Sequence, residues 1–164
     1  MKKEKLYNVI FPIWLMVLIP PIILMVIPAN FIIDSLVLLL GFKILSIADK
    51  FKNYKRCILK VWIFGFLVDI VGSLLLFATQ FMGFSSFLND NLIEPLMWNP
   101  FGNVLALLYA IIVIALCGFL IYKVNYRFSF KKNDLNETQK RFLSLLLALI
   151  TAPYLFLLPT SIFY

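Results

Sequence analysis

The sequence predicts an all-α protein: a polytopic integral membrane helix bundle of five transmembrane helices, with the N-terminus on the cytoplasmic side and the C-terminus outside. The first observation is composition, since 63% of the 164 residues are hydrophobic and 14% are charged, whereas a soluble domain is about half apolar and about a quarter charged. The second is the charge pattern. All 15 basic residues fall into three clusters, at 2–5, 43–60 and 123–141, and the long stretches between them contain no Lys or Arg. Apolar stretches of that length suit a bilayer, and such basic clusters mark its cytoplasmic side.

Residues 6–42 contain one charged side chain, Asp34, and lie between two of the basic clusters. A single helix of this length would extend about 55 Å, whereas the hydrocarbon core of a bilayer is about 30 Å thick. Because both flanks are basic, both ends should be cytoplasmic, which requires an even number of crossings. We therefore expect two spans, at about 7–27 and 31–48, joined by a turn at 28–30, where a proline interrupts the helix and an asparagine suits a turn.

Pro20 and Pro21 lie within the first predicted span and remove two adjacent backbone donors. Such a break persists in a membrane only where neighbouring helices or water satisfy the freed backbone groups. We therefore expect this pair to break or kink the helix. A cleaved signal peptide is the competing interpretation of residues 1–29, but the apolar stretch is too long and too rich in proline for one.

Three further spans are expected, at about 61–81, 101–122 and 142–161. The basic loops 49–60 and 123–141 should be cytoplasmic. The loop 82–100 contains Asp90 and Glu94 but no base, and its apolar residues should hold it at the membrane interface on the outer side. The whole chain then forms a single transmembrane domain.

Local signals predict where the later helices begin and bend. Asn99 before Pro100 predicts the start of the fourth span, since asparagine caps helices and proline fits the first helical position. Asp134 and Glu137 have the spacing of a capping box, which predicts the start of the last helix. The tripeptide at 151–153 ends in proline and should bend that helix.

Two carboxylates lie inside predicted spans and, together with Asn30, form the candidate intramembrane polar site. Asp69 is near the midplane, and Asp34 is about one turn below the outer surface on the same helix face as Asn30. Ionisable groups at such depths are costly and are functional candidates. The alternative is structural: Asp69 holds helices together, and Asp34 serves as a cap or an interface residue. The two should differ in depth by about 12 Å, so they should not form a pair unless the helices tilt strongly.

Three glycines are expected to be helix-packing positions. Gly65 and Gly72 share the Asp69 face of the third span, at spacings of four and three residues, and Gly41 shares the Asp34 face of the second. Small residues let a neighbouring helix approach closely, so both carboxylates should face protein and not lipid.

No catalytic residue is assigned, and the chain is not expected to be an enzyme. It has no His, no nucleophile elbow and no phosphate-binding glycine loop, and neither a metal nor a cofactor is expected. The net charge of +7 is explained by cytoplasmic loops that meet anionic headgroups, so no nucleic-acid partner is expected.

The expected partners are the lipid bilayer and either another membrane protein or further copies of the chain. Heavy use of Ile, Leu, Lys, Asn and Phe indicates an AT-rich bacterial genome, and hence a multi-pass protein of a bacterial plasma membrane.

Two functions fit these observations. The sequence favours a non-catalytic membrane subunit, such as an assembly, regulatory, immunity or accessory protein, which acts through helix–helix contacts along the small-residue stripes. The alternative is a small oligomeric transporter or channel in which Asp69, in the third span, is linked to a proton or another cation. Broken helices and buried carboxylates near the midplane are typical of transporter sites.

Overall fold

The computed structural model describes residues 12–16, 20–82 and 85–162, and within these ranges it contains helices and turns but no β-strand. Four segments are long and apolar enough to cross a membrane, and they contain the long helices α2 (Pro20–Ile44), α3 (Lys50–Ala78), α6 (Val104–Val124) and α7 (Glu137–Ile150). The helical fold agrees with the predicted membrane helix bundle. The shorter elements are α1 (Ile13–Met16), α4 (Ser86–Leu88), α5 (Glu94–Trp98), the 3-10 turns η1 (Thr79–Met82), η3 (Pro100–Gly102), η5 (Tyr154–Leu157) and η6 (Thr160–Ile162), and the π-helical turns η2 (Asn89–Ile93) and η4 (Asn125–Ser129).

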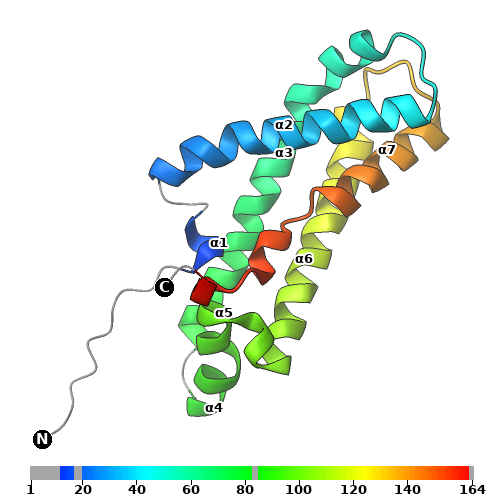
Figure 1. Cartoon of the computed structure of the whole chain (residues 1–164). Helices are drawn as coiled ribbons and strands as arrows, with labels where there is room; N and C mark the ends of the chain where they lie inside the picture. Colours follow the sequence, from blue (N-terminus) through cyan, green and yellow to red (C-terminus); the bar gives the residue numbers. More distant parts are fainter. Residues whose placement is uncertain (1–11, 17–19, 83–84, 163–164) are drawn as a thin grey trace, which may run out of the picture.

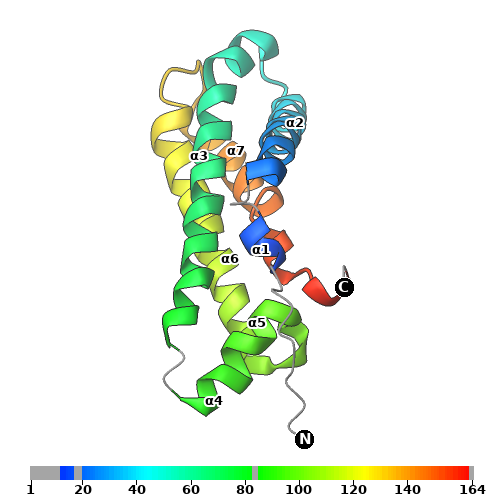
Figure 2. The same ribbon diagram turned by 90° about the vertical axis from the view of Figure 1, so that its left-hand side faces the viewer.

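The four long helices pack in a ring: α2 contacts α3, α3 contacts α6, α6 contacts α7, and α7 contacts α2. Helices α3 and α6 run in opposite directions along the long axis of the molecule, whereas α2 and α7 cross this pair steeply (Figures 1 and 2). The segment that follows α7 returns to the middle of the bundle, where η5 contacts both α6 and α1. The segment at 154–157 therefore packs against α6 and α1, with Phe156 buried between them and the rest of the bundle.

Charge separates along the long axis. The α2–α3 and α6–α7 connections lie at one end of the molecule, and α4 and α5 lie at the other (Figure 1). The first end carries the basic residues near 43–60 and 123–141, and the second carries Asp90 and Glu94. We call these the basic end and the acidic end. This separation is the arrangement that the charge pattern predicts for a membrane protein with cytoplasmic basic loops.

The predicted turn at 28–30 is wrong, because α2 is continuous and contains Pro28 in its interior. The proline pair that begins at Pro20 opens α2 instead. The first backbone N–H groups of a helix have no helical acceptor, so proline costs least there. A lone proline further along removes one hydrogen bond, which membrane helices tolerate when neighbours satisfy the freed carbonyl. The described residues therefore contain four candidate spans, and the predicted spans 7–27 and 31–48 are not separate helices.

The predicted break at Pro20 and Pro21 falls at a boundary of the described structure. Helix α1 ends at Met16 and α2 begins at Pro20, so the pair forms the first two residues of α2. Residues 1–11 and 17–19 lie outside the described residues. The break at this pair therefore stays a prediction, whereas the turn predicted at 28–30 does not occur.

Two other helix starts differ from the predicted ones. Helix α3 begins at Lys50, so most of the predicted loop 49–60 is helical and extends the third span at the basic end. Helix α6 begins at Val104, after Asn103 has capped it by accepting a hydrogen bond from the N–H of Leu105 at 2.8 Å. The charge pattern carries no information about whether the backbone in these segments is helical.

The start of α7 also differs from the prediction. Its capping box consists of Asn136 and Gln139, not of Asp134 and Glu137. The Asn136 side chain accepts from the N–H of Gln139 at 2.8 Å, and the Gln139 side chain accepts from the N–H of Asn136 at 3.0 Å. Asp134 cannot serve as the cap because its carboxylate is paired with Arg56, whose Nη1 lies 2.8 Å from Oδ2.

Two of the predicted packing glycines lie at the closest contacts between helices. A Cβ atom on Gly41 would lie 2.6 Å from the side chain of Leu143 in α7. A Cβ atom on Gly72 would lie 2.6 Å from the ring of Phe156 and 2.7 Å from the sulfur of Cys117 in α6. Any larger residue would force these neighbours apart, so both glycines serve contacts within the chain.

Candidate functional site

A cavity of about 490 Å³ lies between α2, α3 and the segment that follows α7. Its polar side chains come from three separate parts of the chain: Asn30 and Asp34 in α2, Asp69 in α3, and Thr151 directly after α7. The remainder of the wall is mostly aliphatic and aromatic, and it includes Val26, Ile33, Ile150, Phe101 and Phe156. Predominantly apolar walls with a few convergent polar groups are typical of small-molecule sites.

Asp69 is only partly satisfied by the protein. Its Oδ2 accepts a hydrogen bond from Nδ2 of Asn30 at 3.0 Å, which joins the middle of α3 to α2. Its Oδ1 is buried and has no hydrogen-bond partner in the structure. A carboxylate oxygen has strong accepting capacity, and leaving it unpaired in a buried position costs free energy. A proton bound to the carboxyl group would remove this cost.

Asp34 is the more deeply buried of the two carboxylates, with 4% of its surface exposed. Its Oδ2 faces α3 at Gly65, where an added Cβ atom would lie 3.4 Å from that oxygen. The side chain of Thr151 interacts with the carboxylate from the opposite wall. The Thr151 hydroxyl also lies 2.9 Å from the carbonyl oxygen of Leu147, to which it donates. A glycine on α3 thus makes room for the carboxylate of Asp34.

Neither carboxylate has a basic partner among the residues that the structure describes. The ion pairs found there involve Asp134 and Glu137, both at the basic end of the molecule. Asp34 and Asp69 interact electrostatically with each other as well. Two carboxylates that share an apolar cavity repel one another when both are ionised, so the site favours a bound proton or cation.

The end of α7 adds to the negative potential of the cavity. The helix stops at Ile150, since Pro153 has no backbone N–H to continue it. The N–H of Tyr154, which a continued helix would direct to Ile150, donates instead to the carbonyl of Ala152 at 2.7 Å. The phenolic hydroxyl of Tyr154 donates to the carbonyl of Leu149 at 2.6 Å. The C-terminal end of a helix carries a partial negative charge, and here it lies at the wall of the cavity.

Asp34 and Asp69, which the sequence predicts to lie at different depths, line the same cavity in the structure. Depth along the spans separates Asp34 from Asp69 when both helices stand upright, but α2 crosses α3 steeply and both side chains line one cavity (Figures 1 and 2). Asn30 joins the pair through its hydrogen bond to Asp69. The sequence analysis did not identify Thr151 as a member of the site. Pro153, two residues later, predicted a bend in the last helix. A bend does not indicate which helix the side chain of Thr151 faces.

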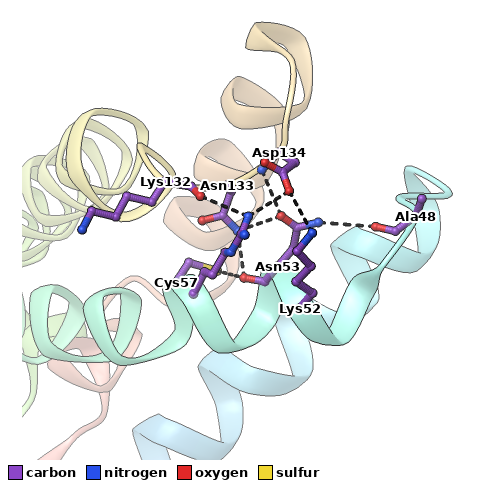
Figure 3. Close-up of polar contacts among 8 residues, drawn as sticks. Ala48, Lys52, Asn53, Cys57, Lys132, Asn133 and Asp134 are labelled. Carbon is purple, nitrogen blue, oxygen red and sulfur yellow. Dashed lines mark hydrogen bonds and ion pairs between the residues drawn. The ribbon is translucent and has the colours of Figure 1, made fainter.

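A second polar cluster lies at the basic end and is centred on Asn53, which is 2% exposed (Figure 3). The side-chain oxygen of Asn53 accepts from the N–H of Asp134 at 3.1 Å, and its amide nitrogen donates to the carbonyl of Ala48 at 3.4 Å. The amide of Asn133 donates to the backbone carbonyl of Asn53 at 2.8 Å. The sequence analysis did not predict this cluster, which ties the start of α3 to the α6–α7 connection.

Comparisons of the chain with models of protein families, with curated proteins and with solved structures found no match.

Proposed function

We propose that the protein is a small transporter of the bacterial plasma membrane that moves a cationic or proton-linked solute through the cavity between α2 and α3. The observation that carries this proposal is the placement of Asp34 and Asp69 on one largely apolar cavity, without a basic partner among the described residues. Buried carboxylates are costly unless a proton or a cation compensates them. The interrupted helix beside them, at 151–153, is a further feature of transporter sites.

The internal contacts of the glycines weaken the alternative proposal of a non-catalytic subunit. That function would use the small-residue stripes as docking surfaces for another membrane protein. Gly41 and Gly72 are covered by side chains of the chain itself, which leaves no open stripe at these positions. The transporter is therefore the function that we favour.

We further propose that the basic end is cytoplasmic and that the C-terminus is outside. The positive-inside rule supports the first statement, and the path of α7 away from the basic end supports the second (Figure 1). A periplasm-type reporter such as alkaline phosphatase should be active when fused after Tyr164 or inserted at 89–94. A C-terminal green fluorescent protein that is bright in the cytoplasm would contradict this orientation.

Proton flux in proteoliposomes tests the transport proposal. We expect a dye trapped inside the liposomes to report pH-dependent flux when sodium, potassium or organic ammonium salts are added across an imposed proton gradient. Asp69→Asn keeps the shape of the side chain and can still pair with Asn30, but it cannot take up and release a proton, so flux should fall at least tenfold while the protein remains folded. Asp90→Asn removes the same charge from the exposed acidic end and should leave flux unchanged. Wild-type protein without flux for any salt would refute the proposal.

A further inference from the structure

The charge of the cavity identifies the sign of its occupant. Two carboxylates, Asp34 and Asp69, and the C-terminal end of α7 all face it. The residues that line the cavity include no Lys and no Arg. The amide of Asn30 is already engaged, since it donates to Asp69. An anionic solute would meet repulsion without a compensating donor, whereas a cation would be attracted by the two carboxylates and by the partial negative charge of the helix end.

The size and composition of the walls identify the remainder of the occupant. A volume of about 490 Å³ far exceeds what a dehydrated metal ion needs, since one water molecule occupies about 30 Å³ in the liquid. Hard metal ions also require a cage of converging oxygen ligands, and the described residues contain no group of three or more His, Cys, Asp or Glu side chains that could hold one. The walls are instead aliphatic and aromatic, which suits an apolar body.

Aromatic residues form part of the cavity wall. Phe156 and Tyr154 follow the break after α7 and line the cavity, and Phe101 in η3 lines it toward the acidic end. The faces of aromatic rings attract organic cations, especially where water is excluded. The contribution of Phe101 also shows that the cavity extends toward the acidic end, where the proposed orientation places the external medium.

We infer that the cavity binds an organic ammonium ion with an apolar body, with its cationic head between Asp34 and Asp69 and its body against the apolar wall. This inference rests on the proposed transport function and specifies its substrate class. The head neutralises the repulsion between the two carboxylates. The body replaces water against the aliphatic and aromatic side chains.

Calorimetric titration of the full-length protein in lipid nanodiscs tests the inference, with the signal of empty nanodiscs subtracted. The probes are 2-phenylethylammonium, the neutral isostere 2-phenylethanol, methylammonium and sodium. We expect 2-phenylethylammonium to bind saturably and at least tenfold more tightly than each of the other three. This comparison needs no variant, so it stands even if a substitution in the cavity prevents folding.

Three variants in the cavity and one control variant outside it separate the contributions of charge and shape. Asp34→Asn and Asp69→Asn should each weaken binding of 2-phenylethylammonium at least tenfold, while Asp90→Asn at the acidic end should not change it. Val26→Phe places a ring into the apolar wall and should weaken binding of 2-phenylethylammonium at least fivefold without weakening that of methylammonium.

The outcomes distinguish this inference from the function on which it rests. Equal binding of the ammonium ion and the alcohol, or equal binding by wild type and both Asp variants, would overturn the substrate class. Sodium or methylammonium binding that depends on Asp69, without binding of 2-phenylethylammonium, would also overturn it but would leave cation-linked transport standing. Absence of carboxylate-dependent binding together with absence of flux would refute both.

Discussion

The side chains of Asn53 and Asp69 on α3 differ in how fully the protein satisfies them, although Oδ1 of Asn133, beside Asn53, is also buried without a hydrogen-bond partner. At the basic end, the side chain of Asn53 both accepts and donates hydrogen bonds within the chain. In the middle of the helix, Asp69 has one hydrogen bond from Asn30 and one buried oxygen without a partner. A polar group whose bonds close within the chain stabilises the fold, whereas a buried charge left open favours binding. The difference supports a structural role for Asn53 and is consistent with the proposed binding role of the cavity.

The two clusters also differ in whether their carboxylates have basic partners. Asp134, beside Asn53, is paired with Arg56 at 2.8 Å and lies 3.6 Å from the amine of Lys52. Asp34, in the cavity, has no ion pair among the described residues and is almost completely buried. Water can solvate the first carboxylate, but the second depends on its neighbours or on an occupant. Substitutions in the Asn53 cluster should therefore lower the free energy of unfolding, whereas substitutions of the cavity carboxylates should weaken binding.

The largest expected effect on stability is at Asn53. Asn53→Ala leaves the buried amide of Asn133 and the N–H of Asp134 with fewer partners, so the free energy of unfolding should fall by about 2–3 kcal/mol. The thermal unfolding midpoint of detergent-purified protein measures this change. Asn89→Ala, an exposed asparagine at the acidic end, is the matched control and should be neutral. An Asn53→Ala variant with the same unfolding midpoint as this control would contradict the structural role of Asn53.

A smaller loss of stability is expected for a substitution at Gly72, where α3 meets the segment after α7. In Gly72→Ala the new methyl group would lie 2.6 Å from Phe156 and 2.7 Å from Cys117, so these side chains must shift. Overpacking of this kind costs about 1–3 kcal/mol. Gly102→Ala, where nothing lies within 4 Å, should be tolerated under the same unfolding assay. Similar midpoints for the two variants would show that the contact at Gly72 is loose.

The smallest effect is expected for the exposed ion pair at the basic end. Asp134 is 65% exposed and the Arg56 side chain 38%, so Asp134→Asn should cost about 0–1 kcal/mol. Because exposed pairs are screened, the difference between wild type and variant should disappear in 1 M salt, where the Debye length is about 3 Å. A large loss that persists in high salt would mean that Asp134 is part of the buried network through more than its backbone N–H.

The candidate site could be predicted only in part. Asp34, Asp69 and Asn30 stand out in sequence because polar side chains are rare in apolar spans. Their convergence on one cavity did not follow, since it depends on the steep crossing of α2 over α3 (Figure 2). Thr151 was predicted only as part of a bend. A hydroxyl two residues before a proline carries no signal for the distant carboxylate that it faces.

The fold could likewise be predicted in class but not in detail. Hydropathy identified the apolar segments, and proline was interpreted as a turn at 28–30, where α2 in fact continues. A single proline removes one hydrogen bond, which tertiary packing can offset, whereas the pair that begins at Pro20 coincides with the start of the helix. Sequence spacing also selected the wrong cap for α7, since Asp134 is held by Arg56 and Asn136 takes its place.

The sequence by itself determined that the chain is a helical membrane protein, which segments are apolar, and which connections carry the positive charge, because each of these depends on the local composition of a segment. Only the tertiary structure decided how the helices cross and which polar groups share a cavity. Those outcomes depend on contacts between residues far apart in the chain, such as Gly41 against Leu143 and Asp34 against Gly65. The pattern along one helix specifies the face that packs, but the shape of the partner surface sets the angle at which it packs.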